Sequence, residues 1–468
     1  MRRFAMVLAL GVGLAVPAGA QAPGDTLHLT LEGAVRRAVE QGEEMRLARA
    51  QVLDANGQIR EALSGALPQV TGSVTYTRQF ASIFQGIGGS DTSSIGKLFK
   101  NSPFGAPNAW NLQLQATQLL WSGGKVGAGL AAAKSFRAAA TLQEAETAAD
   151  VVFRVKQAYL GAAYAGRLLS IAAENLTQAR QHLREVRLFQ QAGTRAEYDL
   201  LRAQVDAANQ EPAVVAARNG YELGLLELKR LVNVPPGQAL VLETALESDD
   251  GTIPVVADDS LESSDRPALA AAEATVHVQE QLVRAAQADR WPSLSLSSTY
   301  SEQAFPTEVS PFAARFRRGW NGEVKLSFPI FLGLKTVGSV ERARASLLRA
   351  EALRDQVREQ VALDVAQAKA ELRRTRSLLA ARRETVRQAK RAHYLASVRY
   401  ANGLATQLEV ADARLLMQQA EVIDVQTMRD YLLALAQVER ALGRPVPVVR
   451  RPVQQAASGL NQEEDVQP

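Results

Sequence analysis

The feature that most constrains this chain is an internal duplication with a fixed offset of 210 residues. The segment 398–421, VRYANGLATQLEVADARLLMQQAE, has a counterpart at 188–211, and the offset also holds well outside these two segments. The matched pairs include Gly193 and Gly403, Trp110 and Trp320, Gly123 and Gly333, and Pro235 and Pro445. The fold is therefore expected to contain two copies of one structural unit.

Residues 1–20 have the features of a secretory signal peptide. Arg2 and Arg3 precede an apolar core at 4–16, and residues 18–20, Ala-Gly-Ala, form a small-residue cleavage site. After residue 20 the sequence contains no stretch of about 18 apolar residues, so no transmembrane helix is expected. The chain has no cysteine, which excludes disulfides, cysteine metal sites and a lipid on an N-terminal cysteine. These observations predict an exported protein.

Charge and histidine placement argue against nucleic-acid binding and catalysis. Without residues 1–20 the chain has 51 basic and 49 acidic residues, so its charge gives no reason to expect a nucleic-acid partner. No phosphate-binding loop is present, and the histidines have neither metal-ligand nor triad spacing. They are His28, His182, His277 and His393. We therefore predict a protein that is not an enzyme and has no cofactor or metal site.

Each repeat is predicted to contain a helix, two strands, a long helix, a turn and a second helix. The first repeat is placed at 21–235 and the second at 266–445, with a linker at 236–265 and a disordered tail at 446–468. Strands are expected at 69–80 and 110–119, and at 293–300 and 320–330. The helices that follow them are expected at 123–192 and 195–231, and at 333–402 and 405–442.

Local signals mark the helix ends. Thr30 is expected to cap the helix that ends near Ser64, and Asp265 or Ser264 to cap its counterpart in the second repeat. Pro212 is expected to kink or break its helix. The helix before each turn glycine would be about 100 Å long at 1.5 Å per residue. Few globular domains have room for such a helix.

The four predicted strands are apolar on one side and polar on the other, which is typical of outer-membrane barrels. The chain's only tryptophans, Trp110, Trp121, Trp291 and Trp320, lie at the predicted strand ends, as expected at membrane interfaces. The alternative is a soluble β-sandwich with core tryptophans. Four strands cannot close a barrel without leaving unpaired backbone groups in lipid. We therefore expect several copies to share one barrel, with the polar face lining a lumen that the helices extend.

The order and duplication of these elements resemble TolC-like outer-membrane efflux proteins, the outer membrane factors. The resemblance covers residues 30 to about 445 and rests on ALPQV, WPSLSL, LLWSGG, FPIFLGL, GTRAEYDLLRAQ and GLATQLEVADAR. It implies a mainly α protein with a membrane β-barrel, in which a homotrimer forms a 12-stranded barrel continued by a periplasmic α-helical tunnel. It implies an outer-membrane exit duct of a tripartite efflux or type I secretion system. The implied partners are a periplasmic adaptor (membrane fusion) protein, an inner-membrane pump or ABC exporter, and the lipid bilayer.

The resemblance also places a pore gate near the turn of the second repeat. It assigns Glu409, Asp412 and Tyr400 to the gate, where three copies would form an acidic ring that favours cations. The alternative is that the two acids form a solvated helix face near a helix N-terminus, where negative charge is favourable.

The turn residues Gly193, Thr194, Arg195 and Gly403 are expected at exposed tips on which an adaptor docks. Ala405 stands where the family pattern can carry a basic residue, whereas Arg195 occupies the matching place in the first repeat. The bonds that hold the closed state are therefore expected to differ from the family pattern.

A pore-free periplasmic coiled-coil adaptor or scaffold is the alternative function. It would share the signal peptide and the long helices, but it would lack four amphipathic strands with tryptophans at their ends.

Overall fold

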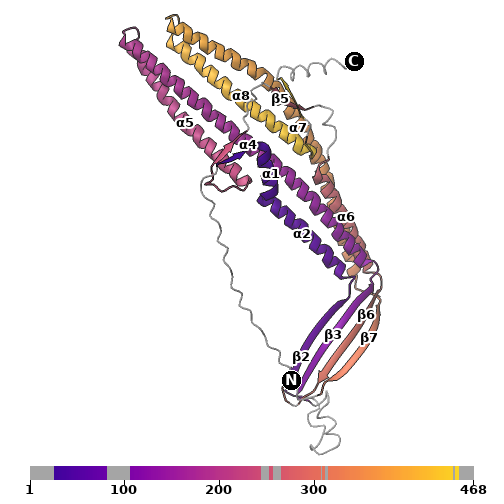
Figure 1. Cartoon of the computed structure of the whole chain (residues 1–468). Coiled ribbons are helices and arrows are strands. Elements are labelled where there is room, and N and C mark those ends of the chain that lie inside the picture. Colours follow the sequence, from indigo (N-terminus) through magenta and orange to yellow (C-terminus); the bar gives the residue numbers. More distant parts are fainter. Residues whose placement is uncertain are drawn as a thin grey trace, which may run out of the picture. The chain divides into compact units, whose positions relative to one another are not determined.

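The structure is a computed structural model that describes residues 26–81, 106–243, 252–256, 265–306, 308–310, 315–445 and 448–452 (Figure 1). The predicted signal peptide at 1–20 lies outside the described residues. The described chain forms two compact units. The first contains the described residues up to Glu40, from Val155 to 243 and from Arg382 to Arg429, and the second contains the remainder.

Two helical hairpins dominate the fold and carry the duplication. The long helices have 67 residues each and are related by the 210-residue offset, so each is about 100 Å long. The helices are α4 (Lys125–Gln191), α5 (Glu197–Leu231), α7 (Lys335–Ala401) and α8 (Gln407–Leu442). The long helices begin two residues later than predicted, because backbone φ is positive at Gly123, Gly124, Gly333 and Leu334.

The capping predictions had mixed outcomes. Thr30 caps the first helix as expected, since its Oγ1 accepts the Gly33 N–H at 3.0 Å. That helix is divided at Gly42, which is extended, into α1 (Leu31–Gln41) and α2 (Glu43–Ser64). In the second repeat α6 (Pro267–Ala288) follows Arg266, which makes no side-chain capping bond. Asp265 is therefore not the cap residue, and Ser264 lies outside the described residues.

The predicted kink or break at Pro212 does not interrupt the helix. Helix α5 continues through this residue. Proline removes one backbone donor from the helix. The buried residues of α5, which are Ala203, Ala207 and Leu228, all lie five or more positions from Pro212, which is exposed.

One four-stranded antiparallel sheet unites the strands of the two repeats, in the order β2-β3-β6-β7. The pairing of β3 with β6 joins the repeats, and its register shifts between Leu119 and Trp121. Within the described residues neither β2 nor β7 has a partner on its outer edge. The strands are β2 (Gln69–Arg78), β3 (Asn108–Trp121), β6 (Ser293–Ala304) and β7 (Arg317–Ser327).

The predicted linker and tail contain short strands that the sequence analysis missed. Strand β4 (Leu240–Leu242) pairs in parallel with β1 (Leu27–Leu29), and β5 (Thr252–Val256) pairs with β8 (Val448–Pro452). The tail prediction is therefore wrong for residues 448–452, which find their partner nearly 200 positions earlier. Residues 453–468 lie outside the described part.

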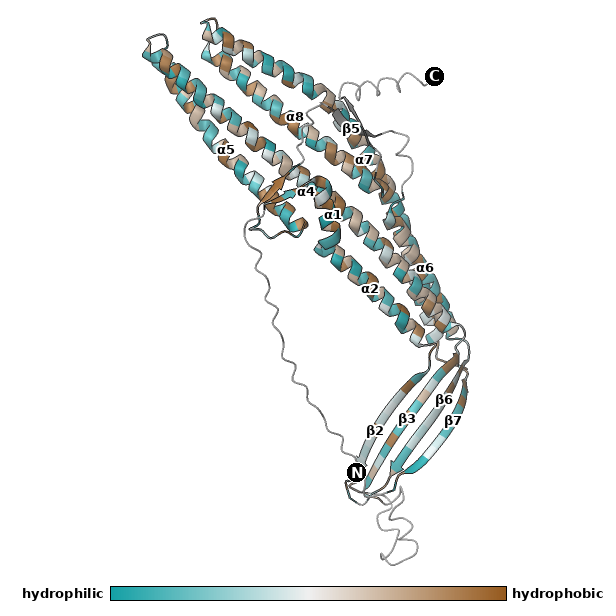
Figure 2. Ribbon diagram, in the orientation of Figure 1, coloured by the Kyte–Doolittle hydropathy of each residue, from teal (hydrophilic) through white to brown (hydrophobic). Residues whose placement is uncertain are grey.

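The helices mix hydrophilic and hydrophobic residues along their whole length (Figure 2). Among the helices described, none combines the length and the apolarity needed to span a bilayer.

Candidate functional site

The two hairpin turns, both in the first unit, have the same backbone structure. Gly193 and Gly403 each have φ of +74°, the left-handed conformation in which glycine avoids a steric penalty. The residue after each glycine donates its N–H to the carbonyl five positions earlier, at 2.9 Å for Thr194 and 2.8 Å for Leu404. This bond satisfies a free carbonyl at the helix end. The tips are thus two copies of one rigid turn.

Arg195 connects the first turn to the second hairpin. Its guanidinium carbon lies 4.2 Å from the centre of the Tyr400 ring, and its Nη2 donates to the Tyr400 carbonyl oxygen at 3.0 Å. Stacking of arginine on an aromatic face and a charged hydrogen bond both favour this contact. The structure therefore brings two of the predicted site residues together, although they are 205 positions apart.

Tyr400 is buried in this contact. It is 5% exposed, its ring lies 5.7 Å from the His182 ring, and its hydroxyl has no hydrogen-bond partner in the described part of the chain. Burial raises the pKa of the Tyr400 phenol, although Arg195 acts in the opposite direction. The ring and the backbone carbonyl, rather than the hydroxyl, make the contact between the hairpins.

Glu409 and Asp412 lie apart from the Arg195–Tyr400 contact and are exposed on α8. Glu409 belongs to a capping box, in which the Thr406 Oγ1 accepts the Glu409 N–H at 3.3 Å and the Glu409 Oε1 accepts the Thr406 N–H at 3.2 Å. Glu409 thus has a local role in starting α8. Its predicted role in a gate concerns an assembly of several copies and stays a prediction, as does that of Asp412.

Four helices of the first unit converge on a polar cluster near these tips. The Arg414 guanidinium of α8 is paired with the Asp206 carboxylate of α5, and the Arg414 side chain is 10% exposed. His182 of α4 and His393 of α7 both interact electrostatically with this guanidinium. We call Arg414, Asp206, His182 and His393 the Arg414 cluster.

A cavity of about 220 Å³ adjoins the cluster, and His182, Asp206 and Arg414 help to line it. Gln407 also lines the cavity; its Nε2 donates to the Asp199 carbonyl oxygen at 3.3 Å, whereas its buried Oε1 has no partner among the described residues. A buried acceptor without a donor costs free energy. The packing here is therefore less favourable than in a fully satisfied core.

The Arg414 cluster was missed by the sequence analysis, which considered the histidines only as metal ligands or catalytic groups. A signal was available, because Arg414 occupies a stripe of buried positions along α8. Its neighbours on the stripe at helical spacing are Gln407, Val410, Met417 and Ala420. A charged residue at such a position needs a partner.

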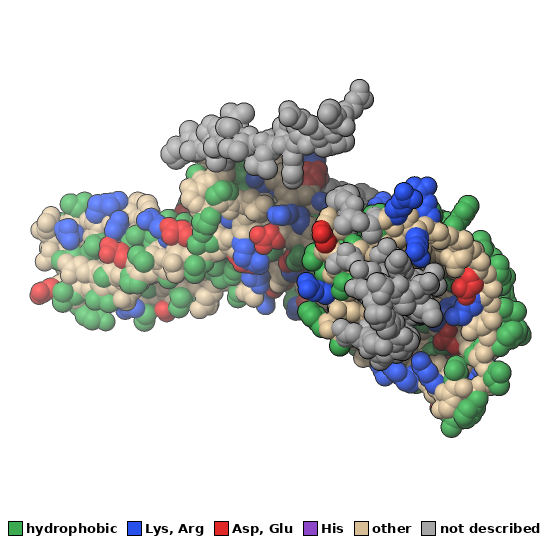
Figure 3. All heavy atoms as spheres, turned by 90° about the horizontal axis from the view of Figure 1, so that it is seen from below, with side chains coloured by type: hydrophobic (Ala, Val, Ile, Leu, Met, Phe, Trp, Pro, Cys, Tyr) green, Lys and Arg blue, Asp and Glu red, His purple; other side chains and the backbone are tan. Residues whose placement is uncertain are grey.

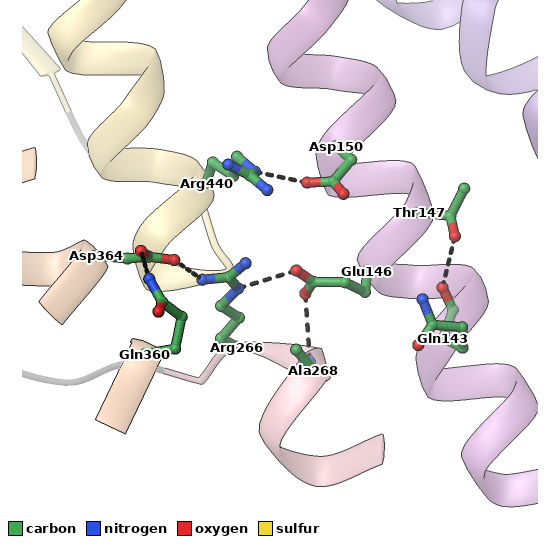
Figure 4. A network of polar contacts seen from close by, with 9 residues as sticks. All are labelled: Gln143, Glu146, Thr147, Asp150, Arg266, Ala268, Gln360, Asp364 and Arg440. Atoms are coloured by element: carbon green, nitrogen blue, oxygen red, sulfur yellow. Dashed lines mark hydrogen bonds and ion pairs between the residues drawn. The ribbon is translucent and has the colours of Figure 1, made fainter. Parts of the chain in front are cut away.

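A second polar network, also missed, lies in the other unit (Figure 4). Arg266, just before α6, donates from Nε to the Glu146 Oε1 at 2.9 Å and from Nη1 to the Asp364 Oδ2 at 2.5 Å. The Arg440 Nε of α8 donates to the Asp150 Oδ1 of α4 at 2.5 Å. The network therefore connects α4, the start of α6, α7 and α8 through charged side chains.

The register of the sheet places the apolar sides of its four strands on one face. Val74, Leu112 and Glu302 are aligned across β2, β3 and β6, and Tyr300 pairs with Trp320. Glu302 interrupts this face, but its carboxylate accepts hydrogen bonds from the Tyr300 hydroxyl at 2.8 Å and the Arg318 Nε at 3.0 Å. The other apolar members of the face are Val70, Tyr76, Trp110, Leu114, Ala116, Leu294, Leu296, Val324 and Leu326.

This apolar face is exposed in the single chain. Val70 is 63% exposed, Val324 68% and Trp320 80%. Figure 3 shows hydrophobic side chains gathered along one outer margin of this region. The soluble β-sandwich is therefore not the observed arrangement, because its core residues would be covered.

The four tryptophans lie near strand ends. Trp121 ends β3 and Trp291 precedes β6, whereas Trp110 and Trp320 are the third residue of β3 and the fourth of β7. The indoles of Trp110 and Trp320 are both hydrogen-bonded. Trp110 Nε1 donates to the Val309 carbonyl oxygen and Trp320 Nε1 to the Ser298 hydroxyl, each at 2.9 Å.

Two curated proteins are similar to this chain. The fusaric acid resistance protein FusA of Burkholderia cepacia is 24% identical over 64% of this chain and 55% of its own length. Protein CyaE of Bordetella pertussis is 27% identical over 71% of each chain. The match to FusA thus spans little more than half of that protein.

Solved structures share the fold. VceC, an outer membrane protein of Vibrio cholerae, superposes with a TM-score of 0.73 at 20% identity, over 89% of this chain and 96% of its own. The open state of the MtrE outer membrane channel of Neisseria gonorrhoeae gives 0.71 at 20% identity, over 88% and 89%. The CmeC outer membrane channel of Campylobacter jejuni gives 0.70 at 18% identity, over 93% and 89%.

A sequence profile of one protein family covers most of the chain, in two blocks that correspond to the two repeats. It matches residues 34–234 and 260–444. The chain therefore belongs to the outer membrane efflux protein family.

Proposed function

We propose that three copies of this chain form a channel in the outer membrane that serves as the exit duct of a tripartite efflux or secretion system. The observation that carries the proposal is the sheet, whose apolar face is exposed and whose two outer strands lack partners among the described residues. An unpaired edge is unfavourable in lipid, so β2 of one copy must pair with β7 of another. Three copies would supply twelve strands.

The polar face of the sheet would line the lumen, because lipid-facing and lumen-facing residues alternate in such barrels. The helical hairpins would extend the conduit into the periplasm. An adaptor protein would dock on the tips at Gly193, Thr194, Arg195 and Gly403, and an inner-membrane pump or ABC exporter would supply the substrate. The name of the relative FusA makes fusaric acid a reasonable first compound to test.

The oligomeric state tests the assembly directly. We expect native mass spectrometry of the protein purified in detergent to give three times the mass of one mature chain. Because edge pairing depends on backbone donors, proline at Val74 in β2 should weaken it, whereas proline in an exposed loop should not. The register, continued from the bond of the Gln79 N–H to the Pro107 carbonyl oxygen, directs the Val74 N–H away from β3. If the protein is a monomer and gives no ion conductance in planar bilayers, the scaffold alternative is favoured.

In the proposed trimer Glu409 and Asp412 form a ring of six carboxylates at the narrow end. Replacing both by alanine is expected to abolish the preference for cations over anions, because the ring's negative charge would be lost. Reversal potentials measured in a salt gradient across a planar bilayer would report this preference.

The Glu409→Gln variant is the control for helix capping, because its amide oxygen can still accept the Thr406 N–H. It removes the charge while preserving the start of α8. If Glu409→Gln/Asp412→Asn retains full cation selectivity, the two acids do not form the gate.

A further inference from the structure

The Arg414 cluster has an arrangement that a purely structural ion pair does not require. The nearly buried guanidinium of α8 is surrounded by side chains from α4, α5 and α7, so each hairpin contributes two helices to the cluster. Among the described residues only Asp206 is paired with it, while two neighbours are imidazoles that gain positive charge on protonation. We propose that the Arg414 cluster is a proton-binding site that separates the two hairpins when His182 and His393 become protonated. This inference concerns the contact between the two hairpins of one chain and goes beyond the proposed function.

Electrostatics determine the direction of the effect. Burial lowers the pKa of both histidines below 6.5, and Arg414 adds to this lowering. Carboxylates act in the opposite direction but do not reverse the shift. Those that face His182 are Glu185, Asp206 and Asp199, and the one that faces His393 is Glu421. Arg202 also lines the cavity, and Lys390 is paired with Glu421 at 3.0 Å.

The sign of the linkage follows from these shifts. A histidine whose pKa is lowered in the packed state stabilises that state above its unperturbed pKa of 6.5. This stabilisation is lost as the pH falls from 6.5 through the lowered value. Each pKa unit of lowering changes the equilibrium between packed and separated hairpins tenfold. Acidification is therefore expected to separate the hairpins.

The packing around the Arg414 cluster is expected to let a small change in charge separate the hairpins. The Gln407 Oε1 and the Tyr400 hydroxyl are both buried without partners in the described chain, and both lie at the contact between the hairpins. Each unsatisfied group reduces the stability of the packed state. A contact that is only moderately favourable can respond to two added charges.

The chain suits a direct measurement, because it contains no native cysteine. Gln191→Cys and Ala401→Cys place spin labels at equivalent exposed positions, on the last residue of α4 and of α7. Labelled chains are diluted into unlabelled protein, so that only distances within one chain are recorded. Electron–electron double resonance at pH 8, 7, 6 and 5 then gives the distance distribution between the hairpin tips.

We expect the longer-distance population to increase as the pH falls below 6.5 in the wild-type background. In His182→Gln/His393→Gln the distribution should be the same at all four pH values, because glutamine does not titrate. The matched control is His28→Gln/His277→Gln, which removes the two exposed histidines and should keep the wild-type response.

Several outcomes would overturn the proposal. The first is an unchanged wild-type distribution between pH 8 and 5, and the second is a response that persists in the double glutamine variant. The third is loss of the response in His28→Gln/His277→Gln, which would assign the response to the exposed histidines. The channel function is tested separately: if acid separates the hairpins but the protein has no conductance, the channel proposal fails and the proton site stands.

Discussion

Replacing Arg266 by methionine is expected to lower the free energy of unfolding by about 3–5 kcal/mol, the usual cost of removing one partner from a buried ion pair. The Arg266 side chain is 10% exposed and the Glu146 side chain 9%, so the carboxylate left behind could not be fully hydrated. Asp364, which is more exposed, would lose its partner as well. The measurement is the urea midpoint of the far-UV circular dichroism signal in detergent, with the slope unchanged.

Two variants show whether charge burial is the cause. Arg266→Met/Glu146→Gln/Asp364→Asn removes the charges together and is expected to recover most of the loss. Arg374→Met breaks an exposed pair with Glu371 on α7 and should change stability by less than about 1 kcal/mol. If the triple variant is as unstable as Arg266→Met, then lost packing rather than unpaired charge explains the effect.

The pH dependence of this network differs from that of the Arg414 cluster. Burial favours the neutral acid, but the hydrogen bonds from Arg266 and Gln360 hold the pKa of Asp364 below its usual 3.8. Its contribution to stability is therefore present above pH of about 4 and is lost as the pH falls through the lowered value. A measurement at pH 5 therefore leaves the Asp364 contact intact.

The duplication made much of the fold predictable. Once Gly193 was matched with Gly403, evidence for one hairpin also applied to the other, and the two long helices have equal lengths at the predicted offset. Strand alternation likewise predicted which residues share a face of the sheet. These features are local and periodic, so they can be read from spacing alone.

The polar contacts could not be predicted because they join residues far apart in sequence. Arg266 meets Glu146 across 120 positions, and Arg414 meets Asp206 across 208. Spacing indicates that a buried arginine needs a partner but does not identify it. The same limit applied to Arg195, which was expected at an exposed tip without a named partner. Its partner Tyr400 was assigned to the gate by the family resemblance.

Substituting Arg195 by alanine is expected to raise the open probability of the proposed channel by about 30- to 1000-fold. The substitution removes a cation–π contact and a charged hydrogen bond between the hairpins, each worth about 1–2 kcal/mol. A tenfold change corresponds to about 1.4 kcal/mol. The measurement is single-channel recording in planar bilayers at neutral pH, where His182 and His393 are expected to be uncharged. Arg187→Ala, at an exposed position of α4, is the control and should leave the channel closed.

Tyr400 provides a sharper comparison, because the structure assigns different roles to parts of one side chain. Tyr400→Phe removes only a buried hydroxyl without a hydrogen-bond partner in the described chain, so the channel should stay closed. Tyr400→Ala removes the ring on which Arg195 stacks, while the backbone carbonyl that accepts its hydrogen bond remains, so it should open the channel less than Arg195→Ala. If Tyr400→Phe opens the channel as readily as Arg195→Ala, the hydroxyl must bond elsewhere in the assembly, and the closed tip is not held by the contact seen within one chain.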